Sequence, residues 1–142
     1  MAAVDPITVL QQALVQFARN SRKHVAYTTV GGSFVAAAVL SYIANTADPT
    51  ATGLAEAYGL DKSTVSRQLA DLEEQGFVRR SRHPRRPRTQ DLHLTAKGKR
   101  ALVTAIERHR DRLVETLATW SARDVAAFAS LLARYVKAAE PG

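Results

Sequence analysis

Two short helical patterns joined by a tight turn, between residues 52 and 75, constrain the fold of this chain more than any other feature. Gly59 stands where a helix C-cap is expected, and Asp61 stands where the N-cap of the next helix is expected. The apolar residues of the second pattern recur at steps of four and three, which places them on one inward face. These residues are Val65, Leu69 and Leu72. The sequence therefore predicts a short helix over 52–58, a tight turn, and an amphipathic helix over 62–75.

The rest of this second helix carries short hydroxyl side chains and hydrogen-bond donors. A helix can enter the major groove of DNA when its outer side chains are short or bear donors. The candidate DNA-contacting residues of the helix are Lys62, Ser63, Thr64, Ser66 and Arg67. The alternative interpretation is a plain helical hairpin whose outer face is simply solvated.

A segment dense in arginine follows directly. Residues 79–88 contain six arginines and no acid. Leu92 and Leu94 alternate beyond it as on one buried strand face, so we expect a β-hairpin with a long basic tip. Arginine can follow DNA phosphates or enter a narrow minor groove. The candidate DNA-contacting residues of the tip are Arg82, Arg85, Arg86 and Arg88. The alternatives are a solvated basic loop, or an arm for RNA or an anionic membrane.

Helical patterns also flank this central part. Apolar residues at steps of three and four predict a first helix over about 6–27. Gly31 and Gly32 break the chain, and Ser33 is the expected cap of a second helix that runs to about Asn45.

Two further helices are expected after the hairpin. Thr95 is the predicted cap of a long helix over about 96–119, and Ser121 caps the last helix. The long helix carries an apolar seam made of Leu102, Ile106, His109, Leu113 and Leu117. The predicted fold class is mainly α with a small β-hairpin.

Composition narrows the function classes. An apolar content of 46% argues against a disordered chain, and the formal charge of +7 is compatible with a polyanionic partner. The sequence has no cysteine, which excludes disulfides, thiolate metal sites and cysteine nucleophiles. No stretch approaches the ~20 apolar residues that cross a bilayer, and no signal peptide is visible, so we expect a cytoplasmic protein without membrane contact.

Catalytic and metal sites are not expected. The histidines show no metal-ligand spacing, and no acid–base pair or nucleophile constellation stands out. We therefore predict no cofactor, no metal and no enzymatic activity. Several aromatic side chains can either line an effector cavity or, more commonly, belong to the core. They are Phe17, Tyr27, Phe34, Tyr42 and Trp120.

Three stretches together resemble the multiple antibiotic resistance regulator (MarR) family. They read LAEAYGLDKSTVSRQLADLEEQGFVRR, LHLTAKGKRAL and TWSARDVAAFASLLARY. The resemblance covers the chain from Ser33 onward, with the first helix in the place of the family's first helix. It implies one MarR-type domain over 1–142, with a winged-helix lobe over 33–95 and dimerisation helices over 1–30 and 96–142.

The same resemblance implies a function. It predicts a homodimer that binds a pseudo-palindromic operator in double-stranded DNA, acts as a repressor, and is released by a small aromatic effector. One position departs from the family, since Arg86 stands where an acid usually steadies the wing arginine, here Arg88. Asp91 is the candidate substitute for that acid. The alternatives are an architectural DNA-binding protein without an effector, and an interaction module that has lost DNA binding.

Overall fold

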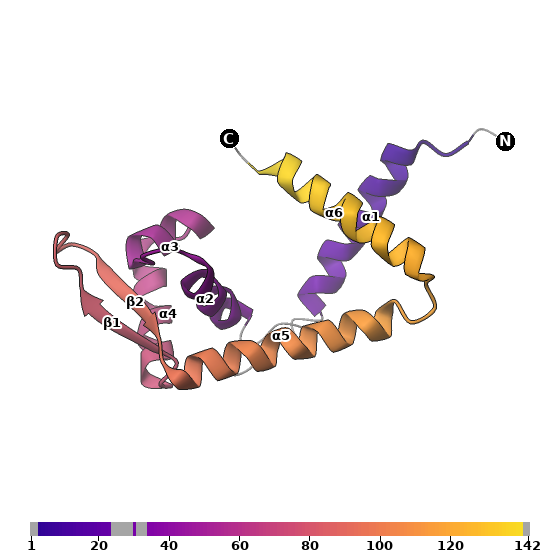
Figure 1. Ribbon diagram of the computed structural model, residues 1–142. Helices are drawn as coiled ribbons and strands as arrows, with labels where there is room; N and C mark the ends of the chain where they lie inside the picture. The colour runs from indigo at the N-terminus through magenta and orange to yellow at the C-terminus, as the bar shows by residue number, and fades with distance from the viewer. Residues whose placement is uncertain (1–2, 24–29, 31–33, 141–142) are drawn as a thin grey trace. The chain divides into compact units, whose positions relative to one another are not determined.

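A computed structural model describes residues 3–23, 30 and 34–140 of the chain. Its elements, shown in Figure 1, are α1 (Pro6–Lys23), α2 (Phe34–Asn45), α3 (Ala51–Tyr58), α4 (Lys62–Glu74), β1 (Val78–Arg82), β2 (Gln90–Leu94), α5 (Ala96–Thr116) and α6 (Ala122–Ala139). The predicted fold class is therefore confirmed. The chain forms two compact units, Met1–Arg108 and His109–Gly142.

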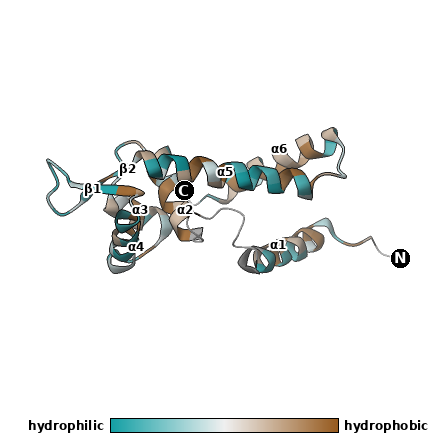
Figure 2. Ribbon diagram, turned by 90° about the horizontal axis from the view of Figure 1, so that it is seen from below, coloured by the Kyte–Doolittle hydropathy of each residue, from teal (hydrophilic) through white to brown (hydrophobic). Residues whose placement is uncertain are grey.

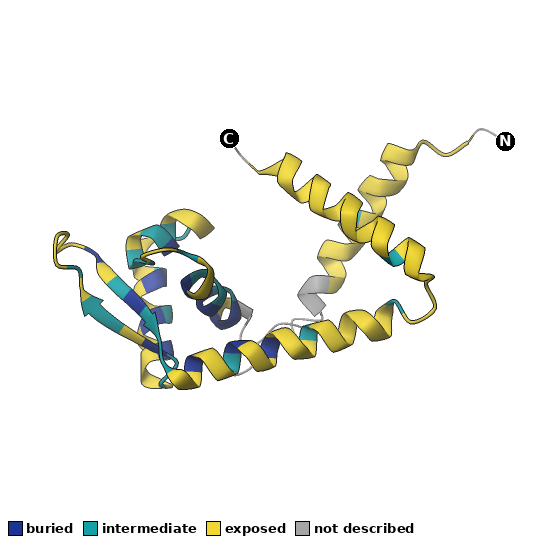
Figure 3. Ribbon diagram, viewed as in Figure 1, coloured by how far each residue is buried: buried dark blue, intermediate teal, exposed yellow. Residues whose placement is uncertain are grey.

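One apolar core holds the centre of the first unit together. α2 and α3 both contact α4 and β2, and β1 packs beside α4. Leu40 of α2 and Leu54 of α3 are fully buried, and the expected inward face of α4 is buried as well. Figure 3 shows these buried positions gathered where the helices meet the base of the hairpin. The core therefore determines which side of α4 remains exposed.

The turn between α3 and α4 has the caps that the sequence predicts. Gly59 is left-handed with φ of 60° and closes α3, because its backbone N–H donates to the carbonyls of Ala55 and Glu56. The Asp61 carboxylate accepts a hydrogen bond of 2.7 Å from the backbone N–H of Thr64 at the start of α4. α3 begins one residue earlier than predicted, because Thr50 caps it through a 3.0 Å bond from Gly53.

The hairpin pairs β1 with β2 in antiparallel register, with Arg80 opposite Leu92 and Arg82 opposite Gln90. Leu92 is buried and Leu94 packs partly buried against the core, as the alternation predicts. Residues 83–89 form the tip. The backbone N–H of Leu92 also donates to the carbonyl of Pro49 at 3.0 Å, so β2 is attached to the chain just before α3.

The ends of the outer helices agree only in part with the sequence. Thr95 and Ser121 cap α5 and α6 as predicted, since their hydroxyls accept from the backbone N–H groups of Gly98 and Asp124. α5 ends at Thr116 rather than near residue 119, and a turn follows it. The predicted cap Ser33 and the end of the first helix, residues 24–27, lie outside the described residues.

Apolar side chains remain exposed on α1, α5 and α6. No residue of α6 is buried, and Leu131 is 53% exposed. Figure 2 shows brown, apolar positions along these helices. The exposed apolar residues of these helices include Ile7, Leu10, Phe17, Val103, Ile106, Leu113, Phe128, Leu131, Leu132 and Tyr135. Among the described residues, none of the helices is both long enough and apolar enough for a bilayer crossing.

Gly98 gives a test of how closely α5 packs on the hairpin. A Cβ at this buried position would overlap the backbone carbonyl of Phe77, just before β1. We expect Gly98→Ala to lower the free energy of unfolding by about 1–3 kcal/mol, although alanine is the better helix former. Urea denaturation at matched protein concentration measures the change. The control Lys99→Ala, at the exposed neighbouring position, should stay within ~0.5 kcal/mol of the parent protein. A Gly98→Ala protein as stable as the parent contradicts the close packing.

Candidate nucleic-acid interface

The exposed side of α4 carries the side chains that the sequence singled out. Lys62, Ser63, Ser66 and Arg67 are exposed, and Thr64 is partly buried. The stripe that includes Val65 and Leu69 faces the core and holds the helix in this orientation. The five candidate residues therefore occupy the first turn and a half of one helix, on the side that the core leaves free.

Asp61 organises the start of that helix. Its carboxylate accepts from the backbone N–H of Thr64 and, at 2.8 Å, from the hydroxyl of Ser63. The hydrogen bond from the Thr64 backbone, followed by that from the Ser63 side chain, lowers the pKa of Asp61 from 3.8 to about 2. Ser63 thus shares its hydroxyl with the cap, which the sequence pattern did not reveal.

The arginines of the hairpin fall into two groups. Arg80 forms an ion pair with Glu73 of α4, with the Arg80 Nη2 to Glu73 Oε1 distance at 3.2 Å and a second contact from Nε at 3.3 Å. These bonds lower the pKa of Glu73 below its usual value. Arg80 therefore joins β1 to α4. The candidate residues Arg82, at the end of β1, and Arg85, Arg86 and Arg88 of the tip are all exposed.

His83 lies at the start of the tip and bonds to its main chain. The Nδ1 atom of His83 accepts hydrogen bonds from the backbone N–H groups of Arg85 at 3.1 Å and Arg86 at 3.0 Å. The Nε2 atom lies 3.8 Å from the Asp91 carboxylate of β2. Asp91, the candidate substitute for the missing wing acid, therefore faces His83 in this structure. Sequence reasoning missed His83, because the side chains that usually form such local bonds to the backbone are those of Ser, Thr, Asn and Asp.

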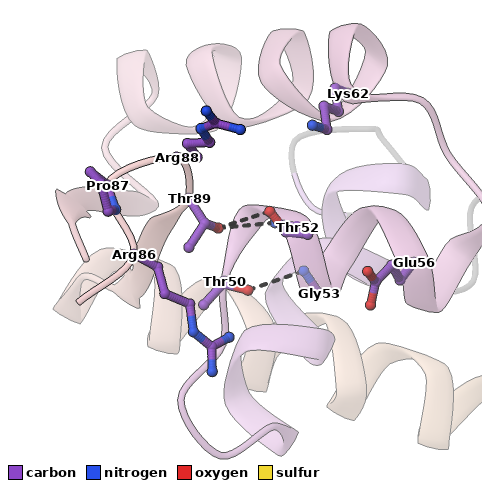
Figure 4. A pocket seen from close by; sticks show the side chains of 9 residues that line it. All are labelled: Thr50, Thr52, Gly53, Glu56, Lys62, Arg86, Pro87, Arg88 and Thr89. Atoms are coloured by element: carbon purple, nitrogen blue, oxygen red, sulfur yellow. Dashed lines mark hydrogen bonds between the residues drawn. The ribbon is translucent and has the colours of Figure 1, made fainter. Parts of the chain in front are cut away.

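An open hollow of about 500 Å³ lies between the tip and the amino ends of α3 and α4 (Figure 4). It brings Lys62 of α4 together with Arg86 and Arg88 of the tip. Thr89 lies at its edge with only 7% of its surface exposed. The Thr89 hydroxyl bonds to the Thr52 hydroxyl at 3.0 Å, so the end of the tip is joined to the first turn of α3. The other residues that line the hollow are Thr50, Gly53, Glu56 and Pro87.

The other candidate residues do not line this hollow. Ser66 and Arg88 line a second, smaller hollow of about 290 Å³ between α4 and the tip. Ser63, Thr64, Arg67, Arg82 and Arg85 line neither hollow. The structure thus brings the two sequence motifs together through Lys62, Ser66, Arg86 and Arg88.

Comparison with known proteins agrees with this geometry. Residues 31–87 match the MarR family. An uncharacterized HTH-type transcriptional regulator of Bacillus subtilis (strain 168), YxaD, is 35% identical over 85 residues, which are 60% of this chain and 59% of that protein. The central part of the chain is therefore similar to the MarR family and to this regulator. The aligned region therefore spans about three fifths of the length of this curated relative.

Solved MarR-type structures share the fold over nearly the whole chain. A MarR family protein from Bacillus stearothermophilus has a TM-score of 0.78 at 22% identity, with 95% of this chain and 97% of that chain covered. The PcaV transcriptional regulator from Streptomyces coelicolor was solved in complex with its natural ligand. It has a TM-score of 0.65 at 27% identity, with 99% of this chain and 100% of that chain covered. The winged-helix fold of the chain is thereby confirmed.

The Asp61 cap predicts a pH dependence at the start of α4. Because its folded pKa is lowered, the stabilisation by the cap is complete above about pH 4 and is lost as the pH falls through about 2. We expect the protection of the Thr64 amide against hydrogen exchange, corrected for the intrinsic rate, to fall over that interval in the parent protein. Asp61→Asn, which keeps the acceptor oxygen, should remove the dependence.

The cap of α3 is the control within the same molecule. Thr50 is uncharged and accepts from Gly53, so the protection of the Gly53 amide should not follow the titration of Asp61. Simultaneous loss of protection at Thr64 and Gly53 would mean that acid unfolds the whole lobe, and would contradict a local effect of Asp61.

Proposed function

We propose that this protein is a sequence-specific, DNA-binding transcriptional regulator that acts as a homodimer. The observation that carries the proposal is the juxtaposition of Lys62, Arg86 and Arg88 at one hollow, beside the exposed face of α4. Two separate motifs thus present one continuous donor-rich surface. Such a surface fits the phosphates and groove edges of duplex DNA.

Each part of the surface has its own role in this proposal. Ser66 and Arg67 of α4 enter the major groove and contact base edges, since a guanidinium can pair with guanine. Lys62, Ser63 and Thr64 lie at the amino end of the helix, where backbone dipoles favour a phosphate. Arg88 enters the adjacent minor groove, and the remaining tip arginines follow phosphates. These are Arg82, Arg85 and Arg86.

The proposed dimer uses the helices outside the lobe. The support for the dimer is the set of apolar side chains that α1, α5 and α6 leave exposed, since large exposed apolar patches mark interaction sites. We assign residues 33–95 to the DNA-binding lobe and residues 1–30 and 96–142 to dimerisation. A twofold dimer places its two α4 helices in major grooves about 34–36 Å apart, which requires a pseudo-palindromic operator.

We also propose control by a small aromatic effector that releases the repressor from its operator in the cytoplasm. The support is the likeness to PcaV, a regulator whose structure contains its natural ligand. Without cysteine, a thiol switch is excluded, so a reversibly bound ligand is the mode of control that we favour. Such a ligand shifts the equilibrium only by its differential affinity for the two states of the dimer. We assign the chain no enzymatic role.

The decisive experiment is selection of genomic fragments by the purified protein, followed by footprinting of the selected DNA. A sequence-specific regulator protects a defined stretch with two related half-sites. An architectural DNA-binding protein protects no defined stretch, and an interaction module retains no fragment. Either of these two results contradicts the proposal.

Arg67 provides the matching test at the level of one side chain. We expect Arg67→Ala to weaken operator binding by about 1–3 kcal/mol per lost base contact and to relax the preference at one position of each half-site. Titrations on operator and on random DNA measure both effects. Arg110→Ala removes an exposed arginine of α5 and should leave the base preference unchanged. Equal weakening on both DNAs would show that Arg67 contacts only phosphate.

The dimer is tested by light scattering at micromolar concentration, where we expect twice the mass of one chain. Leu131→Glu places a charge in the exposed apolar face of α6 and should shift the protein toward the monomer, because a buried unpaired charge is costly. The neighbouring variant Ser130→Glu adds the same charge at an exposed polar position and serves as the control. A monomeric parent protein rules out the proposed assembly.

A further inference from the structure

His83 occupies a position that asparagine or aspartate usually takes in a tight turn. Its Nδ1 atom accepts from the backbone N–H groups two and three residues ahead, at 3.1 and 3.0 Å. Asn and Asp side chains form the same local bonds through a carboxylate or amide oxygen. The turn is continued by a 3.1 Å bond from the Thr89 backbone N–H to the carbonyl of Arg86. The conformation of the tip therefore depends on an acceptor at residue 83.

An imidazole can supply that acceptor in only one form. A neutral ring has one nitrogen that accepts and one that donates, whereas a protonated ring has two donors. With Nδ1 as the acceptor, the proton of the neutral ring is on Nε2, which faces the Asp91 carboxylate at 3.8 Å. The His83 side chain is 19% exposed, although its neighbours in the tip are exposed. The surroundings thus favour one defined tautomer.

We propose that neutral His83 is the positioning residue of the basic tip, and that its protonation at Nδ1 releases the tip. The two backbone groups that His83 binds belong to Arg85 and Arg86, and Arg86 lines the hollow beside Lys62. His83 therefore acts on DNA through these arginines without contacting DNA itself. This inference rests on the proposed DNA binding for its functional consequence, and on the hydrogen bonds alone for its structural part.

The charged and titratable groups around the ring are few and identifiable. The Asp91 carboxylate faces the ring from β2, and the backbone N–H groups of Arg85 and Arg86 donate hydrogen bonds to it. His93, the other histidine of the hairpin, bonds to Ser81 at 3.0 Å. Histidine is the side chain that ordinarily changes charge between about pH 5 and 8, which is the interval that the test covers.

The direction of the pH effect distinguishes this role from simple charge. A histidine that gains a proton near DNA ordinarily strengthens binding, because it adds a positive charge beside the phosphates. Protonation of His83 instead places a third donor against the N–H groups of Arg85 and Arg86, so the ordered turn is lost. Binding at constant salt should therefore weaken as the pH falls, although the protein becomes more positive.

The first arm of the test uses the free protein. Nitrogen NMR of the His83 ring reports its tautomer, and the amides of Arg85 and Arg86 report the turn. We expect the parent protein to have a proton on Nε2 near neutral pH and to lose protection of both amides as His83 titrates. His83→Asn should keep the protection at every pH, and His83→Ala should lack it. Amides that remain protected in His83→Ala overturn the proposal.

The second arm measures DNA affinity with the same proteins and His93→Gln as the control for a lost histidine. At neutral pH we expect His83→Ala to bind about five- to tenfold more weakly than the parent, and His83→Asn to bind as the parent does. Between about pH 7.5 and 5.5, parent affinity should fall, and that of His83→Asn should not. The DNA affinity of His93→Gln should fall over the same pH interval, as that of the parent does. Parent affinity that rises on acidification overturns the proposal.

The two arms separate failure of this inference from failure of the proposed function. If the parent protein binds no DNA but the amides follow His83, the positioning role stands and DNA binding is refuted. If the parent binds DNA but neither the amides nor the affinity responds to His83→Ala, the positioning role is refuted and DNA binding stands.

Discussion

The structure of the lobe depends on burial of one stripe of α4. Val65, Leu69 and Leu72 are each at most 3% exposed, packed with side chains of α2, α3 and the hairpin. Burial of three such side chains contributes several kcal/mol, on the order of 1.5–3 kcal/mol each, so rotation of the helix about its axis is strongly opposed. This constraint presents Ser66 and Arg67 to solvent. The specificity of the proposed interface is thus a consequence of the core, because the same packing that stabilises the lobe determines which polar groups face outward.

A second constraint places the tip relative to that helix. Leu92 donates to Pro49, and Thr89 bonds to Thr52, so both the strand and the end of the tip are attached to the start of α3. Among the described residues, Thr89 is the one buried polar residue, and its hydroxyl forms a hydrogen bond with that of Thr52. A buried hydroxyl without a partner is costly, which makes this contact specific as well as stabilising. The distance between the basic tip and the amino end of α4 is therefore determined by hydrogen bonds that involve no arginine.

The helices and strands could be predicted from the sequence, but the contacts between them could not. Periodicity and caps predicted α4, Gly59, Asp61 and the hairpin, because each depends on residues close together in the chain. The bond between Thr89 and Thr52 joins residues 37 positions apart, and no local pattern signals it. The sequence singled out Arg82, Arg85, Arg86 and Arg88, and these are exposed, but it did not reveal that Glu73 binds Arg80 and joins it to α4. Long-range pairing, rather than residue type, decides which cations are available to a partner.

The absence of an acid at position 86 has a physical counterpart in His83. An acidic residue can order a basic tip, but its charge then lies beside the phosphates that the tip is proposed to meet. A neutral imidazole supplies the same kind of acceptor to the backbone N–H groups of Arg85 and Arg86 without that negative charge. The acidic group near the ring is the carboxylate of Asp91, which lies on β2 and faces the Nε2 atom of His83. The tip can therefore be ordered without carrying a negative charge, as long as the Nδ1 atom of His83 is unprotonated. Dependence on pH is the consequence of using histidine where asparagine would have served the turn alone.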